Sequence, residues 1–218
     1  MTSSTDTALL AALRSRMVAC QLRDRGISAE RVLEAMTRVP RHEFVADGDR
    51  DQAYEDYPLP IGAGQTISQP YIVAIMLQAL ELTPADRVLE VGTGSGYATA
   101  LLAELAAEVV SMERHSALAG RAAELLERLG YTNVQVIVGD GAQGFSAGAP
   151  YNAILVSAAA PEVPPALLAQ LSEGGRMVLP VGPADSQQLQ LIQMRNGQPH
   201  TMLREMCRFV PLVSGIGS

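Results

Sequence analysis

The sequence predicts an α/β protein with a doubly wound, Rossmann-like sheet of about seven strands, mostly parallel with an antiparallel C-terminal pair, behind a helical N-terminal extension. Three observations predict it. After Thr83-Pro84, short continuous apolar runs alternate with helical patterns, as in parallel strands buried on both faces. A turn with three glycines, Gly92-Thr-Gly-Ser-Gly96, breaks the first of these runs. The residues before Thr83 show helical periodicity.

Length and composition suit one compact unit. The chain has 218 residues, 48% of them hydrophobic and 18% charged, which is too small for two unrelated domains. We expect residues 1–82 to form a helical region packed on a larger α/β domain of residues 83–218. Sixteen basic residues, all arginine, stand against 23 acidic ones, and the net charge of −7 disfavours nucleic acid as a partner. The absence of lysine excludes Schiff-base chemistry and a Walker phosphate loop.

Two helices should open the chain. Apolar residues recur at helical spacing from Thr7 to about Arg25, and Gly26 ends that pattern. Ser28 is placed to cap a second helix, which Pro40 stops. The arginines of this region are more typical of a solvated helical face than of a binding patch.

The next segment, residues 41–67, contains glycines and prolines but little periodicity. A stretch of this length without regular structure is more often functional than idle, so we expect it to form part of a site. Pro70 then opens a helix through about Leu82, because proline suits the first turn of a helix.

Five apolar runs after Pro84 are the expected parallel strands. They are Val88–Val91, Val109–Met112, Val134–Val138, Ala153–Ser157 and Met177–Val181, with helices near Tyr97–Ala107, Ser116–Leu129 and Pro164–Leu171 between them. Asn196-Gly197, a dipeptide typical of hairpin turns, separates Leu189–Met194 from a segment around Met206–Leu212. The sheet should therefore close with an antiparallel pair.

The glycine-rich turn is the strongest local signal for a ligand. Glycine has no Cβ to block close approach, and the helix that follows offers unpaired N–H groups at its N-terminus. The spacing is GxGxG rather than the GxGxxG of dinucleotide sites, and Glu90 lies two residues before Gly92. A carboxylate there would repel a pyrophosphate but compensate a cationic ligand such as S-adenosylmethionine, which has an amino and a sulfonium group. A plain tight turn is the alternative.

Two more acidic residues follow the neighbouring strands. Glu113 comes about 20 positions after Gly92, where an acidic side chain typically takes ribose hydroxyls. Asp140, in Gly139-Asp140-Gly141, should lie at the same edge of the sheet and accept a hydrogen bond from an adenine amino group. Either acid alone is as easily explained as a helix cap. Together with Glu90 they favour a nucleoside pocket.

Other chemistry is not indicated. Cys20 and Cys207 lack the spacing of a zinc site or a disulfide framework, and we expect no bound metal. His42, His115 and His200 are too scattered for a catalytic triad.

The chain carries no signal for a membrane or for secretion. Met1–Asp6 is polar, and the longest apolar runs fall short of the roughly 18 to 20 residues that cross a bilayer. We therefore expect a monomeric, soluble protein of the reducing cytoplasm with neither a membrane nor a nucleic-acid partner.

Five segments, taken together and in order, match the motifs of one known family. They are Gly64–Pro70 (GQTISQP), Val88–Tyr97 (VLEVGTGSGY), Val138–Gly141, Ala158–Pro161 and Arg208–Leu212, and Val39–Val45 is also similar. In this order they resemble the protein-L-isoaspartate O-methyltransferase family, from about Arg16 to Leu212. Many methyltransferases share the glycine turn, whereas GQTISQP is much more specific.

The resemblance implies an enzyme that transfers the methyl group of S-adenosylmethionine to the free α-carboxylate of L-isoaspartyl residues in damaged proteins and peptides, leaving S-adenosylhomocysteine. It implies a substrate lid over the methyl-transfer site, with Ser68 as the active-site hydroxyl. The expected peptide-binding residues are Gln65, Thr66, Ile67, Ala158, Arg208 and Val210. The expected cofactor-binding residues are Glu90, Gly92, Thr93, Gly94, Ser95, Gly96, Glu113, Arg114, Asp140 and Gly141.

Other interpretations stay open. Ser68 precedes Pro70 closely enough to be a helix cap, and spacing alone favours that role. The chain could instead be a methyltransferase of the same fold acting on RNA or a small molecule, or a binding module without activity. The net charge and the lack of an Asn/Asp-Pro-Pro-aromatic motif argue against RNA. Ala63 and Asn152 depart from the family pattern, and the first could loosen the lid.

Overall fold

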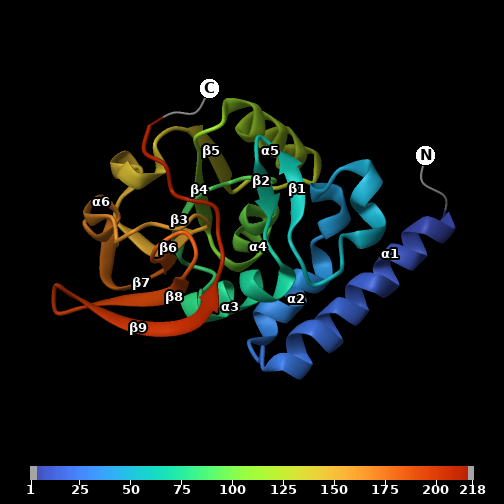
Figure 1. Cartoon of the computed structure of the whole chain (residues 1–218), viewed down its shortest axis with the longest axis horizontal. Helices are drawn as coiled ribbons and strands as arrows, with labels where there is room; N and C mark the ends of the chain where they lie inside the picture. The colour runs from blue at the N-terminus through green and yellow to red at the C-terminus, as the bar shows by residue number, and fades with distance from the viewer. Residues whose placement is uncertain (1–3, 216–218) are drawn as a thin grey trace.

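The computed structural model describes residues 4–215. The polar start predicted at Met1–Asp6 therefore lies partly outside the described residues. A seven-stranded sheet crosses the molecule in the order β5-β4-β3-β6-β7-β8-β9 (Figure 1). Its strands are β3 (Arg87–Val91), β4 (Glu108–Glu113), β5 (Val134–Val138), β6 (Tyr151–Val156), β7 (Leu171–Val181), β8 (Gln187–Arg195) and β9 (Gln198–Cys207). The first five pair in parallel and the last two antiparallel, so the predicted fold class is confirmed.

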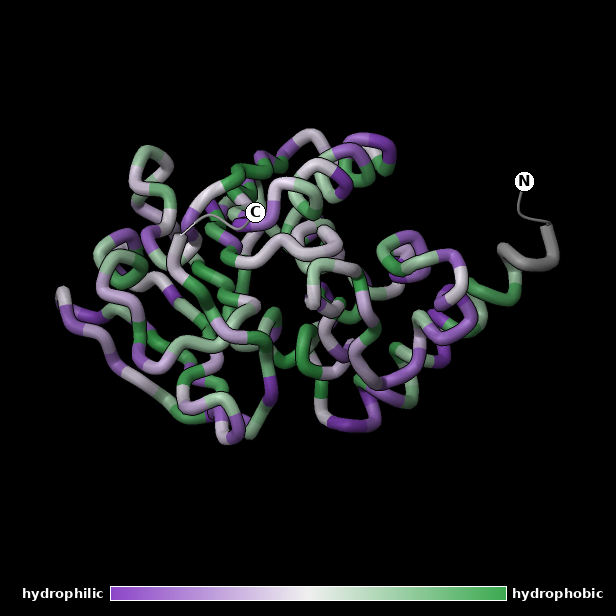
Figure 2. Tube along the Cα trace, turned by 45° about the horizontal axis from the view of Figure 1, so that its top comes forward, coloured by the Kyte–Doolittle hydropathy of each residue, from purple (hydrophilic) through white to green (hydrophobic). Residues whose placement is uncertain are grey.

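Helices and turns cover both faces of the sheet. The helices of this part are α3 (Pro70–Leu80), α4 (Tyr97–Leu105), α5 (Ser116–Arg128) and α6 (Pro165–Leu168). Alternate residues of each strand enter different cores. Val88 joins a large core that includes α3 and α4, whereas Leu89 and Val91 join a smaller core with α6. Figure 2 shows the apolar segments gathered in the central strands.

The antiparallel hairpin starts earlier than expected. Asn196 and Gly197 form the predicted turn, with φ of 53° and 69°. The return strand follows at once at Gln198–Cys207, so the prediction around Met206–Leu212 is wrong. Met206 and Cys207 end this strand, and the residues after them run beside the segment that follows β6. There the Ala159 N–H donates to the Val210 carbonyl at 2.8 Å, which holds the C-terminal segment near the edge of the sheet.

The helix predicted at Pro164–Leu171 is shorter, because β7 begins at Leu171. The long β7 also extends N-terminally past the predicted start at Met177.

The first predicted helix has three parts. α1 (Ser4–Arg16) continues through a π-helical turn, Met17–Leu22, and a short 3₁₀ turn that Gly26 ends with φ of 93°. Met17 and Leu22 are both fully buried. Residues five apart share one side of the wider π turn, so this turn lets both enter the core.

The predicted cap of the second helix is wrong. α2 (Glu30–Arg38) starts after Ala29, and no side chain of its own N-terminus caps it. Instead, Gln78 of α3 accepts hydrogen bonds from the N–H groups of Ser28 and Ala29, at 2.8 and 2.9 Å. The cap therefore comes from another helix, which sequence spacing cannot show.

Residues 41–67 are more regular than expected. They form two 3₁₀ helices, Arg41–Phe44 and Asp47–Gln52, and a hairpin of β1 (Leu59–Gly62) and β2 (Gln65–Ile67). Ala63 lies at the hairpin tip with φ of 52°, a conformation that a side chain disfavours. The segment is therefore built from short elements, each too short to give a periodic pattern.

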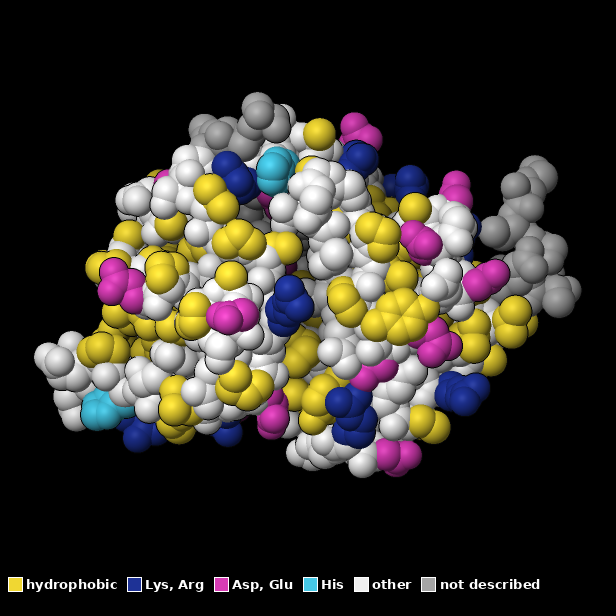
Figure 3. Space-filling model, in the orientation of Figure 1, with side chains coloured by type: hydrophobic (Ala, Val, Ile, Leu, Met, Phe, Trp, Pro, Cys, Tyr) yellow, Lys and Arg dark blue, Asp and Glu magenta, His cyan; other side chains and the backbone are white. Residues whose placement is uncertain are grey.

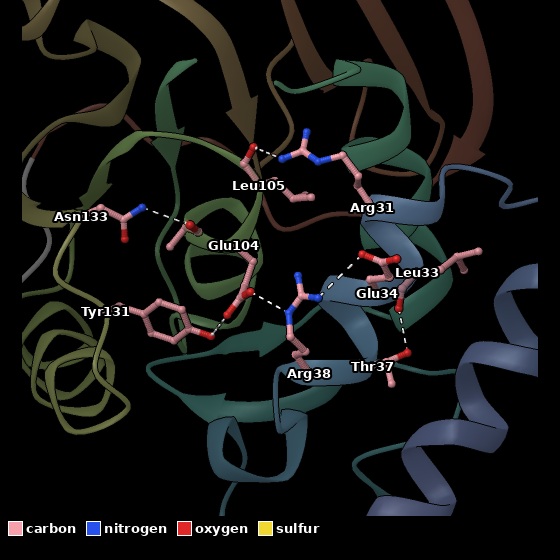
Figure 4. Close-up of polar contacts among 10 residues, drawn as sticks. Arg31, Leu33, Glu34, Thr37, Arg38, Glu104, Leu105, Tyr131 and Asn133 are labelled. Carbon is pink, nitrogen blue, oxygen red and sulfur yellow. Dashed lines mark hydrogen bonds and ion pairs between the residues drawn. The ribbon is translucent and has the colours of Figure 1, made fainter. Parts of the chain in front are cut away.

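The N-terminal helices are bound to the α/β part by polar contacts as well as by the shared core (Figure 4). Arg31 of α2 donates to the carbonyls of Leu82 and Leu105, the second at 2.8 Å. Arg38 pairs with Glu104 of α4 at 2.8 Å. The expected division at residue 82 stays a prediction, because a single core cluster spans it.

Charges of both signs are interspersed on the face of the molecule seen in Figure 3. Within residues 4–215, no helix has both the length and the apolar composition needed to cross a bilayer.

Candidate active site

The glycine-rich turn lies between the end of β3 and the start of α4. Gly92, Gly94 and Gly96 have φ of 96°, 55° and 88°, a region of backbone conformation that glycine adopts without a steric penalty. A Cβ on Gly94 would also approach Ile61 Cδ1 to 3.3 Å. The turn therefore depends on glycine for its backbone path as well as for space.

A cleft opens at the carboxyl ends of β3, β4 and β6, where ligands bind in sheets of this type. β2 and the residue after it, Ser68, also line this cleft. Most predicted site residues line it, namely Gln65, Thr66, Ile67, Ser68, Gly92, Thr93, Gly94, Ser95, Glu113, Arg114, Gly141, Ala158 and Val210. Glu90, Gly96, Asp140 and Arg208 do not belong to this lining.

Glu113 is the buried carboxylate of the cleft, with 5% of its surface exposed. One oxygen accepts from the Gly94 N–H at 2.9 Å and the other from the His115 N–H at 3.0 Å. Each carboxylate oxygen can still accept a second hydrogen bond. The glycine turn therefore orients a carboxylate that can receive hydroxyl groups from a ligand.

The Glu90 side chain is completely buried and does not line the cleft, so its predicted contact with the cofactor stays a prediction. Its Oε2 accepts from Thr99 of α4 at 2.5 Å and from Ser111 of β4 at 2.6 Å. Ser111 in turn contacts the hydroxyl of Thr93, which lines the cleft, at 2.6 Å. Glu90 therefore reaches the cleft only through other side chains.

Burial, with a smaller contribution from the negative charge of Glu113, raises the pKa of the Glu90 carboxyl to a net value of about 7. The hydrogen bonds from Ser111 and Thr99 act in the opposite direction. Near neutral pH this carboxyl therefore titrates, in contrast to an ordinary surface glutamate.

Asp140 acts as a cap, the alternative left open above. Its Oδ1 accepts from the Ala142 N–H at 3.0 Å, at the start of a short 3₁₀ turn, and its Oδ2 accepts from Gly215 at 2.8 Å. Asp140 itself does not line the cleft, although the next residue, Gly141, does. Its predicted contact with the adenine amino group stays a prediction.

Gly96 and Arg208 also lie outside the lining. Gly96 packs away from the cleft, where a Cβ would come within 3.3 Å of Ala122. Arg208 is exposed, while Val210, two residues further, lines the cleft.

Ser68 lines the same cleft as Glu113, and it is not the cap of α3. Asp56 supplies the acceptor instead, since its Oδ1 receives the Tyr71 N–H at 3.3 Å. Asp56 also accepts from the side chain of Gln69 at 2.7 Å. The Ser68 hydroxyl is thereby free of the structural role that sequence spacing favoured.

The chain matches one family model, described as protein-L-isoaspartate(D-aspartate) O-methyltransferase, over residues 13–217. The chain belongs to this family. The family predicted from the sequence motifs is therefore confirmed, and with it the enzyme class, a protein-L-isoaspartate O-methyltransferase. Family membership favours this activity over the alternatives of RNA or a small molecule as acceptor.

Two protein-L-isoaspartate O-methyltransferases are similar over nearly the whole chain. The one from Koribacter versatilis (strain Ellin345) is 54% identical over 217 residues, which are 100% of this chain and 98% of that protein. The one from Methanoculleus marisnigri is 56% identical over 205 residues, which are 94% of this chain and 93% of that protein.

Solved structures of the same family have the same architecture. One protein-L-isoaspartate O-methyltransferase superposes with a TM-score of 0.84 at 29% identity, covering 94% of this chain and 67% of that chain. A second, from Plasmodium falciparum in complex with S-adenosyl-L-homocysteine, superposes with a TM-score of 0.81 at 28% identity, covering 92% and 98% of the two chains. These similarities assign no role to a single residue, so the residue roles stay predictions.

Sequence reasoning about this methyltransferase missed several lining residues. Ser157 follows β6 and His115 follows Glu113, so both could have been found as residues at strand ends. Tyr97 and Val213 also line the cleft. The C-terminal segment was not missed, because the family resemblance marks Arg208–Leu212 as bordering the substrate peptide, and Val210–Leu212 line the cleft.

In the described part of the chain, histidine, cysteine and carboxylate side chains do not gather in any group of three or more that could hold a metal ion. Cys20 is exposed and Cys207 half-buried, and both are free thiols. Burial raises the pKa of the Cys207 thiol to about 11, so it stays protonated and unreactive at neutral pH.

Proposed function

We propose that this methyltransferase holds S-adenosylmethionine against one side of the cleft and methylates the free α-carboxylate of an L-isoaspartyl residue on the other. The cofactor wall consists of Gly92–Ser95, Glu113 and Arg114, and the acceptor wall of Gln65–Ser68 and Val210. The observation that carries the proposal is one cleft lined by both an oriented carboxylate, Glu113, and a serine with no capping role, Ser68.

The cofactor wall fits a nucleoside attached to a cationic group. Glu113 would accept the ribose hydroxyls, because its two oxygens are held by backbone N–H groups and keep free lone pairs. Glycines at the turn allow a ligand to approach the main chain. The negative charge of Glu113 favours a cation in the cleft. When bound, S-adenosylmethionine supplies an electrophilic methyl group, and S-adenosylhomocysteine is the product.

The acceptor needs orientation rather than activation. A carboxylate is already ionised near neutral pH, so no general base has to remove a proton from it. Catalysis would then come mainly from alignment, which can supply roughly 7 to 11 kcal/mol in favourable systems. Ser68 would donate a hydrogen bond to the acceptor carboxylate and fix its direction. Gln65, Thr66, Ile67, Ala158 and Val210 would contact the peptide around it.

A direct test is methyl transfer from labelled S-adenosylmethionine to an isoaspartyl peptide, with the same peptide containing normal aspartate as the control. We expect a base-labile methyl ester on the isoaspartyl peptide and little label on the control. Equal labelling of both peptides would contradict the acceptor assignment. Cofactor binding without any transfer would favour a binding module.

We further propose that the enzyme acts as a monomer in the cytoplasm, on unfolded or aged proteins, without nucleic acid or a membrane as partner. The net charge of −7 supports this, because it repels polyphosphate and acidic lipid surfaces. Sedimentation velocity should give a single species near 23.1 kDa. A larger species, or RNA binding that weakens with salt, would contradict the proposal.

A further inference from the structure

Arg41 is the largest fully buried side chain of the methyltransferase, with none of its surface exposed. It starts the 3₁₀ helix Arg41–Phe44, and its Nε donates to the Ala53 carbonyl at 2.7 Å. Its Nη2 donates to the Ser68 carbonyl at 2.8 Å. The guanidinium therefore connects the N-terminal region directly to the residue that faces the acceptor.

The charge of Arg41 is not neutralised by an ion pair. Among the residues that the structure describes, no carboxylate oxygen lies within ion-pair distance of it. Asp56, the acid whose charge acts on Arg41, is itself paired with Arg25. Burial lowers the pKa of Arg41 to about 10, so the side chain keeps its positive charge at neutral pH. A buried charge without a counter-ion is costly and calls for a functional explanation.

The guanidinium lies one side chain behind the cleft. Its carbon is 4.8 Å from the ring centroid of Tyr97, and Tyr97 lines the cleft. Its Nη1 and the Tyr97 hydroxyl are buried without a hydrogen-bond partner. Partial compensation therefore comes from the two carbonyls and the ring face, with a small contribution from the charge of Asp56.

We infer that Arg41 is a positioning residue that holds Ser68 from behind and makes the acceptor side of the cleft favour a carboxylate over a neutral carboxamide. The inference rests on the proposed role of Ser68. A charge removed from water is screened little, so it acts on an anion several ångströms away. The planar fork can hold two carbonyls at once, which the ammonium of a lysine does less well.

The test compares three variants of the full chain. Arg41→Met removes the charge, and Arg41→Lys keeps it while losing the fork. Arg31→Met is the matched control, because Arg31 also donates to two main-chain carbonyls that join the N-terminal region to the α/β part, those of Leu82 and Leu105 rather than that of Ser68 (Figure 4). Each variant is saturated with S-adenosylhomocysteine, so no turnover occurs. Calorimetry then measures the Kd of an isoaspartyl peptide and of the same peptide with a carboxamide in place of the α-carboxylate.

We expect the wild type and Arg31→Met to prefer the carboxylate peptide by about 30-fold, as expected for one weakly screened charge. Arg41→Met should lower this preference below about 3-fold, and Arg41→Lys should keep most of it while kcat falls. The Kd of S-adenosylhomocysteine should change by less than about 2-fold in every variant.

Three results would overturn the inference: an unchanged preference in Arg41→Met, an equal loss of preference in Arg31→Met, or a matching loss of S-adenosylhomocysteine binding. A failure of the proposed function is separate, since there the wild type would not methylate the isoaspartyl peptide at all.

Discussion

The two walls of the cleft are held in different ways. On the cofactor wall, Glu113 is oriented by N–H groups of Gly94 and His115, both at the ends of adjacent strands. The acceptor wall is held by side chains from distant parts of the N-terminal region, since Arg41 donates to the Ser68 carbonyl and Asp56 accepts from Tyr71. The cofactor wall is oriented by main-chain groups at the edge of the sheet, whereas the acceptor wall is held by a few side chains that are distant from it in the sequence. Single substitutions should therefore affect the two walls separately.

The largest effect is expected from Ser68→Ala, which should lower kcat/KM for an isoaspartyl peptide by about 100-fold or more, as for loss of one positioned donor at a reacting oxygen. Binding of S-adenosylhomocysteine, measured by calorimetry, should stay within about 2-fold of the wild type because Ser68 is on the other wall. Ser68→Thr is the control, since it keeps a hydroxyl. A marked loss of cofactor affinity in Ser68→Ala would contradict the assignment of Ser68 to the acceptor wall.

Glu90 tests how the cofactor wall is supported from behind. Below pH 4.5 its carboxyl is neutral in the folded and the unfolded chain, but between pH 4.5 and about 7 only the unfolded chain loses the proton. The free energy of unfolding should therefore fall with pH across this window, by up to about 3 kcal/mol from this group. Glu90→Gln should lack this contribution, so its stability relative to the wild type should rise with pH. Urea unfolding at several pH values measures it, and parallel pH curves for both proteins would contradict the burial argument.

Glu113→Ala should weaken cofactor binding, whereas Ser68→Ala should lower the rate of methyl transfer. It leaves ribose hydroxyls and two N–H groups without their acceptor, so cofactor affinity should weaken by about 1 to 3 kcal/mol. The KM for the peptide should change little. Glu113→Gln keeps one acceptor oxygen and should lose less. Unaltered affinity in the alanine variant would show that the nucleoside binds elsewhere.

Much of the cofactor wall could be predicted because its signals are local. The glycine turn and Glu113 each follow an apolar strand, and parallel strands bring their carboxyl ends to one edge. The burial of Glu90 has a physical reason in the same strand. Successive side chains point to opposite faces, so Glu90 shares a face with Val88 and lies under α4 rather than in the cleft.

The acceptor wall could not be derived from local patterns. The GQTISQP motif marked it by family resemblance, but Ser68 was expected on spacing alone to cap α3. Asp56, well upstream, takes that role, and the buried state of Arg41 depends on Ala53 and Tyr97 together. Such contacts join residues distant in the chain, so only the tertiary fold specifies them.

The smallest effect should come from Asp56→Ala, which removes the acceptor at the start of α3. We expect a loss of about 1 kcal/mol in the free energy of unfolding, typical of a lost helix cap, with cofactor binding unchanged. Asp56→Asn keeps an acceptor oxygen and should restore most of the stability. If the asparagine variant were as unstable as the alanine variant, the ion pair with Arg25 would matter more than the cap.

A crystal structure with S-adenosylhomocysteine and an isoaspartyl peptide bound together tests the division of the cleft most directly. The account predicts ribose hydroxyls on Glu113 and the peptide α-carboxylate within hydrogen-bond distance of the Ser68 hydroxyl. A nucleoside bound against Ser68, or a carboxylate held away from it, would contradict the account.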